Sequence, residues 1–411
     1  MAELDVRFVR QHFPAFHDAP LGGYFFDSAA GSLPCQETIE ALNEFYTQTK
    51  IQPGNNFAAS QCGMEKMQLA KQRWANALGV KQNELGFGPS TTQNIYVLAQ
   101  AFRAMFKAGD EIVITNQDHE SNIGAMYRAA EAAGATVRIW QANSETGLLN
   151  PDDLDALLSS NTKLVCFPHA SNITGQKNEA KRIVALAKAA GAFTLVDGVS
   201  YAPHAIPDVT EMGADIYVFS LYKVYSVHQG VMVVREHLLE LLPKQGHYFK
   251  EGLDVSERLV PAGPDHAQIA ASNGTIDYIE TLSAHHGGPV DSERGAAAFV
   301  SSLWQAHEQK LTAPLLKFLE SAQSARLIGS GTADEWRCPL VSFSPTNDKP
   351  EDLAHILCDQ NILVSAGHYY APRLLEQVGL EPARGVIRFS MAHYNTTEEV
   401  DYLISKLESL L

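Results

Sequence analysis

The chain has 411 residues, of which 45% are hydrophobic and 19% are charged. This balance is typical of a soluble globular enzyme and excludes a disordered chain, and the length predicts a large core and two domains. The formal net charge of -16 argues against the basic patch that binding to nucleic acid requires, so we expect no nucleic-acid partner.

The N-terminus and the cysteines indicate the compartment. Residues 1–5 lack the basic and apolar regions of a signal peptide, and no apolar run reaches membrane-spanning length. We therefore expect a cytoplasmic protein without a membrane partner. The cysteines are odd in number and show no pairwise spacing, which predicts neither disulfides nor a zinc or other metal site. They are Cys35, Cys62, Cys166, Cys338 and Cys358.

The N-terminal part of the chain predicts helices around one tight turn. Residues 1–22 carry a short amphipathic segment, and residues 24–34 place small side chains between an aromatic strand and a proline, where backbone can approach another group closely. Apolar periodicity predicts helices at residues 34–50 and 64–77, with a loop at 52–56 between them.

Three hydroxyl residues, Ser90, Thr91 and Thr92, begin the next predicted helix, which runs to about Phe106. Free amides at a helix N-terminus, the helix dipole and hydroxyl donors together favour an anion such as a phosphate. The alternative is a plain helix cap, because Ser and Thr are usual cap residues. This stretch alone favours the cap.

The middle of the chain alternates strands and helices regularly. This rhythm predicts an α/β fold with a mostly parallel sheet and helices on both of its faces. The predicted strands are residues 110–114, 136–140, 163–167, 193–196, 215–219 and 230–235, and the predicted helices are a segment ending at Ala133 and residues 151–158 and 178–190.

Polar side chains follow three of these strands, at ends that should share one edge of the sheet. They are His119 with Asn122, then Asn172, and then Asp197. An acid at the tip of an apolar strand is costly to bury, so Asp197 needs a cation or strong donors. A protonated pyridine nitrogen is one such partner, and a structural ion pair is the alternative.

Lys223 follows the apolar strand of residues 215–219 within four residues. Open α/β sheets bind ligands at this end of a strand, and desolvation there lowers the pKa of a lysine enough for Schiff-base chemistry. On this stretch alone an ordinary surface lysine is the better interpretation. The polar residues upstream favour the interpretation of Lys223 as a Schiff-base lysine.

In this order the residues resemble the class V aminotransferases, the group of fold type I pyridoxal-phosphate enzymes that includes the cysteine desulfurases. The resemblance covers nearly the whole chain. Its most specific motifs are Asp27-Ser28-Ala29-Ala30, Asp118-His119-x-x-Asn122, Ser171-Asn172-x-x-Gly175, Val196-Asp197-Gly198, Asp215-x-Tyr217-x-Phe219-Ser220-x-x-Lys223, and Arg388 with Tyr394-Asn395-Thr396.

The resemblance implies a fold and its division. We expect a large domain like that of aspartate aminotransferase, with a mostly parallel sheet of the seven-stranded type, and a smaller α+β C-terminal domain. The N-terminal segment, residues 1–35, should pack with the small domain. Residues 36–285 should bind the cofactor, and residues 286–411 should hold a linker helix and the small domain, with strands at 340–344 and 385–390.

The resemblance also implies pyridoxal 5'-phosphate as the cofactor. Lys223 would form the internal aldimine and then move protons as a general base and acid. Asp197 would keep the pyridinium nitrogen protonated, so that the ring accepts electrons from the substrate. His119 would stack on the ring as the third catalytic residue. The remaining expected cofactor contacts are Ser90, Thr91, Thr92, Asn172, Ser200, Ser220 and Tyr222.

An amino-acid substrate and a homodimer follow from the same resemblance. Arg388 is the candidate for the substrate carboxylate, because a guanidinium matches a carboxylate with two parallel hydrogen bonds, and a salt bridge to another element is the alternative. We expect Ala30, His368 and Tyr370 beside the substrate. Thr275, in Asn273-Gly274-Thr275, resembles a segment that reaches the neighbouring subunit's phosphate.

Departures from the family pattern bear on the reaction. Tyr370 stands where related cysteine desulfurases carry a loop cysteine that accepts sulfur, and a phenol cannot replace a thiolate. Tyr222 replaces a common histidine, and Ser200 stands where a glutamine often contacts the cofactor. We predict a cysteine desulfurase-like or C–S lyase activity, with transamination close behind and epimerisation as a further alternative. A sulfur relay through Cys62 and a non-catalytic cofactor-binding protein are the other hypotheses.

Overall fold

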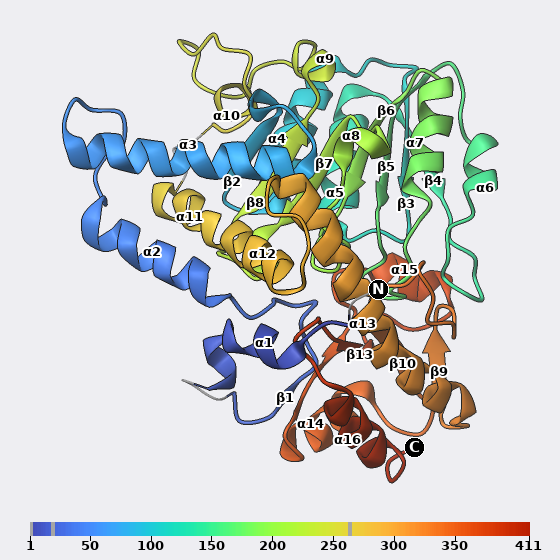
Figure 1. Ribbon diagram of the computed structural model, residues 1–411. Coiled ribbons are helices and arrows are strands. Elements are labelled where there is room, and N and C mark those ends of the chain that lie inside the picture. The colour runs from blue at the N-terminus through green and yellow to red at the C-terminus, as the bar shows by residue number, and fades with distance from the viewer. Residues whose placement is uncertain (1–2, 18–20, 262–264) are drawn as a thin grey trace.

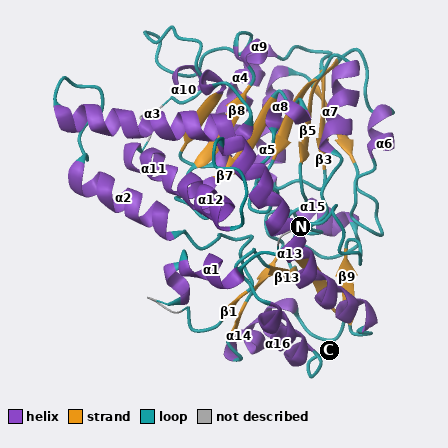
Figure 2. Cartoon of the chain, in the orientation of Figure 1, coloured by secondary structure: helices purple, strands orange, loops and turns teal. Residues whose placement is uncertain are grey.

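The computed structural model describes residues 3–17, 21–261 and 265–411. One large sheet lies between layers of helices, and a smaller sheet built mainly from C-terminal strands lies beside it (Figure 1). Met1, Ala2 and residues 18–20 of the predicted N-terminal segment lie outside the described residues. Figure 2 shows how the strands gather in these two places and the helices enclose them.

The large sheet has seven strands in the order β2-β8-β7-β6-β5-β3-β4. Five neighbouring strands run parallel, and β8 runs antiparallel to both β7 and β2. The mostly parallel sheet is therefore confirmed. The strands are β2 (Leu85–Gly88), β3 (Glu111–Thr115), β4 (Thr136–Trp140), β5 (Thr162–Pro168), β6 (Phe193–Asp197), β7 (Ile216–Ser220) and β8 (Gly230–Val234).

Successive side chains of a strand point to opposite faces of the sheet, and helices bury both faces of this sheet. Ile112 and Ile114 contact the core on the side of α4 and α5, whereas Val113 contacts the core on the side of α3 and α7. The covering helices are α2 (Gln36–Gln48), α3 (Ala58–Leu78), α4 (Thr91–Met105), α5 (Glu120–Ala133), α6 (Pro151–Asp155), α7 (Ala180–Ala189), α8 (Val209–Met212), α9 (Glu236–Leu239), α10 (Val255–Arg258), α11 (His266–Ala271) and α12 (Asn273–His285).

The smaller region has its own core. It contains a four-stranded antiparallel sheet in the order β12-β13-β10-β9, and β1 pairs with β11 in parallel. Its elements are β1 (Tyr24–Phe25), α13 (Glu293–Ser321), β9 (Ala325–Ile328), β10 (Leu340–Pro345), α14 (Pro350–Asp359), β11 (Ile362–Leu363), β12 (Ser365–Gly367), α15 (Pro372–Gln377), β13 (Val386–Ser390) and α16 (Thr397–Leu407).

The N-terminal segment divides its contacts between the two regions. Strand β1 joins β11, as the prediction that this segment packs with the small domain requires. Helix α1 (Val6–Gln11) instead contributes Val9 to the core cluster of the large sheet. Phe13, just after the helix, packs in a T-shaped arrangement on Tyr278 of α12. The predicted boundaries at 35/36 and 285/286 stay predictions.

Two predicted helices extend further than their apolar patterns indicated. Helix α3 begins at Ala58 rather than at residue 64, and α13 continues to Ser321 through Pro314. The buried residues in the first turns of α3 are Ser60 and Gly63, so these turns carry little apolar periodicity. Within the part of the chain that the structure describes, no helix is both long and apolar enough to cross a membrane.

A glycine at the start of β8 determines where α4 begins. Gly230 pairs with Ser220 and Gly88, and a Cβ at this position would lie 2.3 Å from the carbonyl carbon of Ser90 and 2.4 Å from the backbone nitrogen of Thr91. Because backbone atoms on both sides are held by secondary structure, neither can move away without cost. The observed start of α4 is therefore possible only because residue 230 is a glycine.

We expect Gly230→Ala to destabilise the fold by about 1–3 kcal/mol, the usual cost of overpacking a core. Urea denaturation followed by circular dichroism measures this. Gly63→Ala is the matched control, because its added Cβ would meet neighbours at ordinary distances of 3.4 Å and more. Equal unfolding midpoints for the two variants would show that the strand and the helix can separate at no cost.

Candidate active site

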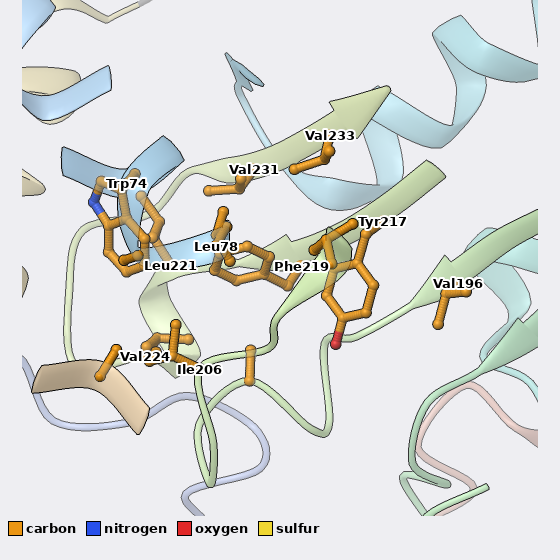
Figure 3. Close-up of a cluster of buried hydrophobic side chains, with 14 of the residues drawn as sticks. Trp74, Leu78, Val196, Ile206, Tyr217, Phe219, Leu221, Val224, Val231 and Val233 are labelled. Carbon is orange, nitrogen blue, oxygen red and sulfur yellow. The ribbon is translucent and has the colours of Figure 1, made fainter. Parts of the chain in front are cut away.

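Lys223 lies at the carboxyl end of β7, on a short turn that buried neighbours hold in place. Strand β7 ends at Ser220, and a 3-10 turn, Leu221–Lys223, follows. Figure 3 shows Leu221 and Val224, which flank the turn, directed into the cluster of buried side chains around Trp74. Neither Leu221 nor Val224 has any exposed surface, so a movement of the turn that carries Lys223 would expose both side chains to solvent.

The side chain of Lys223 lines a pocket of about 480 Å³, a volume that includes the open space at the entrance. The carboxyl ends of β5, β6 and β7 and the N-termini of α4 and α5 form its walls, as expected for an open α/β sheet. The lining residues are Thr91, Thr92, Asp118, His119, Ser121, Pro168, Ala170, Asn172, Asp197, Val199, Ser200, Ser220, Tyr222 and Lys223.

Burial lowers the pKa of Lys223 to about 8, with the positive charge of Arg388 as a second cause. The carboxylates of Asp197 and Asp27 act in the opposite direction. A substantial fraction of the amine is therefore neutral near pH 8. Nucleophilic attack on a carbonyl requires this neutral form, and an exposed lysine holds very little of it at that pH.

Two buried carboxyl groups face the same pocket. Burial raises the pKa of Asp197 to about 6, although a hydrogen bond from the Val199 amide, at 2.8 Å, lowers it. Burial, followed by the charge of Asp197, raises the pKa of Asp118 well above its usual value. The Asn122 amide donates to Oδ2 of Asp118 at 2.9 Å, whereas Oδ1 has no partner. The charge of Lys223 also lowers the pKa of Asp197, but among the described residues Asp197 forms no ion pair.

Hydroxyl groups gather where α4 begins. Thr91 Oγ1 lies 2.7 Å from Ser220 Oγ, and both residues line the pocket with Thr92. Ser90 does not line it, because its hydroxyl accepts a hydrogen bond from the Gln93 amide at 3.1 Å and caps the helix. The two interpretations of this stretch therefore apply to different residues: Ser90 is the cap, and the other hydroxyls face the pocket.

His119 presents a neutral ring at the N-terminus of α5. Burial, together with the charges of Lys223 and Arg388, lowers the pKa of His119 to about 4. Nδ1 accepts a hydrogen bond from the Ser121 amide at 3.1 Å, which fixes the ring. A neutral imidazole can stack on a cationic aromatic ring without charge repulsion.

Arg388 lies on β13 and is 2% exposed. Its Nη1 donates to the carbonyl of Asn172 at 3.2 Å, and its Nη2 lies 3.5 Å from Asp27 Oδ1. Nε is buried without a partner. The guanidinium thus belongs to the small region but is held against a loop of the large sheet, with donors still free.

The sequence model of the class V aminotransferases, described as "Aminotransferase class-V", matches residues 24–286 and 296–403. The chain belongs to the class V aminotransferase family. An aminotransferase-like protein, FGM3, of Gibberella zeae is 32% identical over 98% of both chains. A cysteine desulfurase of Pectobacterium carotovorum is 29% identical over 98% of this chain and 97% of that one.

Solved structures confirm fold type I. An apo cysteine desulfurase from Thermococcus onnurineus NA1 superposes with a TM-score of 0.87 at 24% identity, covering 100% of this chain and 98% of that one. A cysteine desulfurase, CsdA, from Escherichia coli gives 0.81 at 23% identity, with 99% and 98% covered. The predicted fold, a large α/β domain with a smaller C-terminal one, is therefore correct.

Class V aminotransferases use pyridoxal phosphate, and the pocket fits it on three counts. A desolvated lysine of lowered pKa would meet the aldehyde, and the buried Asp197 would meet the ring nitrogen. The hydroxyls of Thr91 and Ser220 at the start of a 15-residue helix would meet the phosphate. In the described residues no cluster of His, Cys, Asp and Glu side chains could hold a metal ion.

Besides Ser90, five predicted site residues do not line the pocket. One of them is Arg388, on β13. Thr275 is completely buried within α12, with its hydroxyl 3.0 Å from Thr38, so in this chain it reaches no surface from which it could serve a neighbouring subunit. Ala30 and His368 are exposed and do not line the pocket. Tyr370 is 65% exposed, and its ring centroid lies 5.1 Å from that of His119, at the pocket's edge.

The site also contains residues to which the sequence assigned no role. Asp118 lines the pocket, and an acid directly before His119 at a strand end was the available signal. Tyr369, whose default interpretation was packing, lies over Arg388, with 3.8 Å between the guanidinium carbon and the ring centroid. Asp27 pairs with the same arginine. The motif that begins at Asp27 gave no role to Asp27 itself, and the sequence did not indicate the contact of Tyr369, because both contacts with Arg388 join distant segments.

Proposed function

We propose that the protein is a pyridoxal-phosphate enzyme that cleaves a C–S bond of a small amino acid and releases its products directly. Three lines support this. The family model and curated relatives include cysteine desulfurases. The pocket supplies the acid, base and anion sites that the cofactor needs. The loop that would carry a sulfur-accepting cysteine carries Tyr370 instead.

The chain's own groups account for the proton transfers. When bound, pyridoxal phosphate supplies an electron sink for the substrate α-carbon. Lys223, partly neutral near pH 8, can take the proton from that carbon and return it elsewhere. Asp197 would balance the positive charge of the ring nitrogen, and Arg388 would offer its free N–H groups to the substrate carboxylate.

The position of the cysteines is the observation that separates this proposal from a protein-bound persulfide. All five lie within the described residues, and none lines the pocket. Cys35, Cys166 and Cys338 are buried, and burial raises the pKa of each thiol. Thiolate is the form that accepts sulfur. Cys62 lies on α3 and Cys358 on α14, away from the pocket lining.

The test supplies L-cysteine to the holoprotein and measures sulfide, pyruvate and alanine, with intact-protein mass recorded in parallel. We expect sulfide to accumulate over many turnovers while the protein mass stays unchanged. A sulfur-modified protein whose formation disappears in Cys62→Ser or Cys358→Ser would contradict direct release. Amine transfer from L-alanine to a keto acid, without sulfide from cysteine, would favour the aminotransferase alternative, which the relative in Gibberella zeae supports.

Tyr370→Ala is expected to change sulfide release by less than about threefold, because an exposed ring outside the pocket contributes little. Steady-state sulfide formation measures this. Tyr370→Phe is the control, since it removes only the phenol. If both variants lost activity to the same large extent, the phenol itself would participate, and direct release would need a different acceptor.

We further propose a cytoplasmic homodimer. Helix α2 exposes Ile39 and Tyr46, seven residues apart and hence on one face, with 40% and 49% of their surface accessible. Nearby in sequence, Phe57 is 48% exposed. Exposed large apolar side chains on one face of a helix support an interaction site there. Sedimentation equilibrium would give the mass of a dimer, and a monomer at all concentrations would refute it.

A further inference from the structure

Arg388 is enclosed by a ring of contacts that closes on itself. Asp27 Oδ1 lies 3.5 Å from Nη2, and Asp27 Oδ2 accepts a hydrogen bond from Ser365 Oγ at 2.8 Å. The hydroxyl of Tyr369 donates to the Ser365 carbonyl at 2.5 Å. Asn172 Nδ2 donates to the Tyr369 carbonyl at 2.8 Å, and the Asn172 carbonyl accepts from Nη1 of Arg388.

Tyr369 covers one face of the guanidinium within this ring. The guanidinium carbon lies over the phenol ring, 3.8 Å from its centre, which is within the range of a cation–π contact. Because the hydroxyl is bonded to Ser365, opposite Arg388 in the β12–β13 ladder, the aromatic ring cannot rotate away. The plane of the guanidinium is thus fixed by an aromatic side chain and not only by its edge contacts.

The loop that carries Tyr369 is itself tied to the large sheet. The Tyr370 carbonyl accepts a hydrogen bond from the Glu120 amide at 2.7 Å, at the N-terminus of α5. Arg373 forms an ion pair with the Glu120 side chain. Tyr369 and Tyr370 have φ of 47° and 59°, a left-handed conformation that residues with side chains rarely adopt. Such a backbone persists only where surrounding contacts impose it.

Three of the five N–H groups of Arg388 have no recorded partner, and Nε among them is completely buried. A buried donor without an acceptor is costly, so the structure holds this edge for a ligand. The anion must be planar and small, because the face is covered by Tyr369 and one end by Asp27. A single carboxylate meets these requirements.

We propose that Tyr369 is a positioning residue that holds the Arg388 guanidinium in the plane needed to recognise one substrate carboxylate. The proposal rests on the proposed function, in which Arg388 binds an amino acid. This proposal adds to the proposed function by assigning substrate selection to an aromatic residue at the base of the loop. Asp27 completes the selection, because its negative charge beside Arg388 repels a second carboxylate on the substrate.

The experiment compares L-alanine with L-alaninamide, which has the same shape but no carboxylate. Binding to the holoprotein is followed through the visible absorbance of the lysine-linked cofactor, and the ratio of the two dissociation constants measures carboxylate recognition. We expect Tyr369→Leu to reduce this ratio about tenfold, the scale of a desolvated cation–π contact. Tyr369→Phe keeps the ring and should retain most of the ratio.

A double-mutant cycle with Arg388→Met isolates the coupling. If Tyr369 acts through Arg388, adding Tyr369→Leu to Arg388→Met changes the ratio no further. Equal weakening of both ligands in Tyr369→Leu would overturn the proposal, since a residue that only supports the loop affects both alike. If the wild type binds pyridoxal phosphate without a visible band, the proposed function fails. If the band forms and the ratio stays unchanged in Tyr369→Leu, only this inference fails.

Discussion

Lys223→Ala is expected to abolish the visible absorbance band of the holoprotein and to reduce turnover by on the order of 10³-fold or more. The variant removes the only side chain lining the pocket that can bond covalently to an aldehyde, and it removes the proton carrier at the same time. Cofactor held only by the hydroxyls of Thr91 and Ser220 and by Asp197 should be lost on gel filtration. Absorbance spectra before and after that step measure the effect.

Lys177→Ala is the matched control for this variant. Lys177 is also buried, at 9% exposure, but its Nζ donates to the Glu335 carbonyl at 2.8 Å and does not line the pocket. It should keep the band. A Lys223→Ala protein that retained covalently bound cofactor would refute the assignment, because another amine would then have to hold it.

The lowered pKa of Lys223 adds a pH dependence that the same assay can detect. Apoprotein should react with pyridoxal phosphate at a rate that rises with pH and reaches half its maximum near pH 8, since only the neutral amine attacks. Arg388→Met removes one cause of the lowering, so its midpoint should move to higher pH. A midpoint unchanged by Arg388→Met would mean that burial alone sets the pKa.

Local patterns were sufficient for most of the fold. Strand β4, Thr136–Trp140, was predicted at its observed residues, because apolar alternation and flanking turns are properties of the segment itself. No strand was predicted at β2, Leu85–Gly88, because two glycines leave few side chains to show a pattern. Its strand conformation comes from pairing with β8, which lies far along the sequence.

The site residues likewise divide into those that local patterns predict and those that depend on contacts between distant segments. Lys223, Asp197 and Asn172 each follow a buried strand, so their meeting at one edge follows from parallel topology and could be predicted. The contact of Tyr369 with Arg388 requires β12 and β13 to lie side by side, which no local pattern states. The burial of Thr275 could not be predicted either, because a motif of three residues carries no information on whether α12 buries it.

Asp197→Asn is expected to make the apoprotein more stable while making the holoenzyme nearly inactive. The raised pKa of Asp197 means that the folded state tolerates the charged carboxylate poorly. This cost is absent well below pH 3.8, where the carboxyl is protonated in both folded and unfolded chains. It grows between the ordinary value of 3.8 and about 6 and is complete above that. Asparagine removes it and can still accept the hydrogen bond from Val199.

The free energy of unfolding of apo Asp197→Asn should therefore exceed that of the wild type by about 1–3 kcal/mol at pH 7.5 and match it at about pH 3. Urea denaturation at the two pH values measures this difference. The holoenzyme variant should nevertheless be less active than the wild type, because an amide cannot balance the charge of the cationic ring nitrogen. Its turnover should fall on the order of 10² to 10³-fold. Destabilisation of the apoprotein at pH 7.5 would show that Asp197 already has a cationic partner within the chain. Its charge would then serve the fold rather than the cofactor.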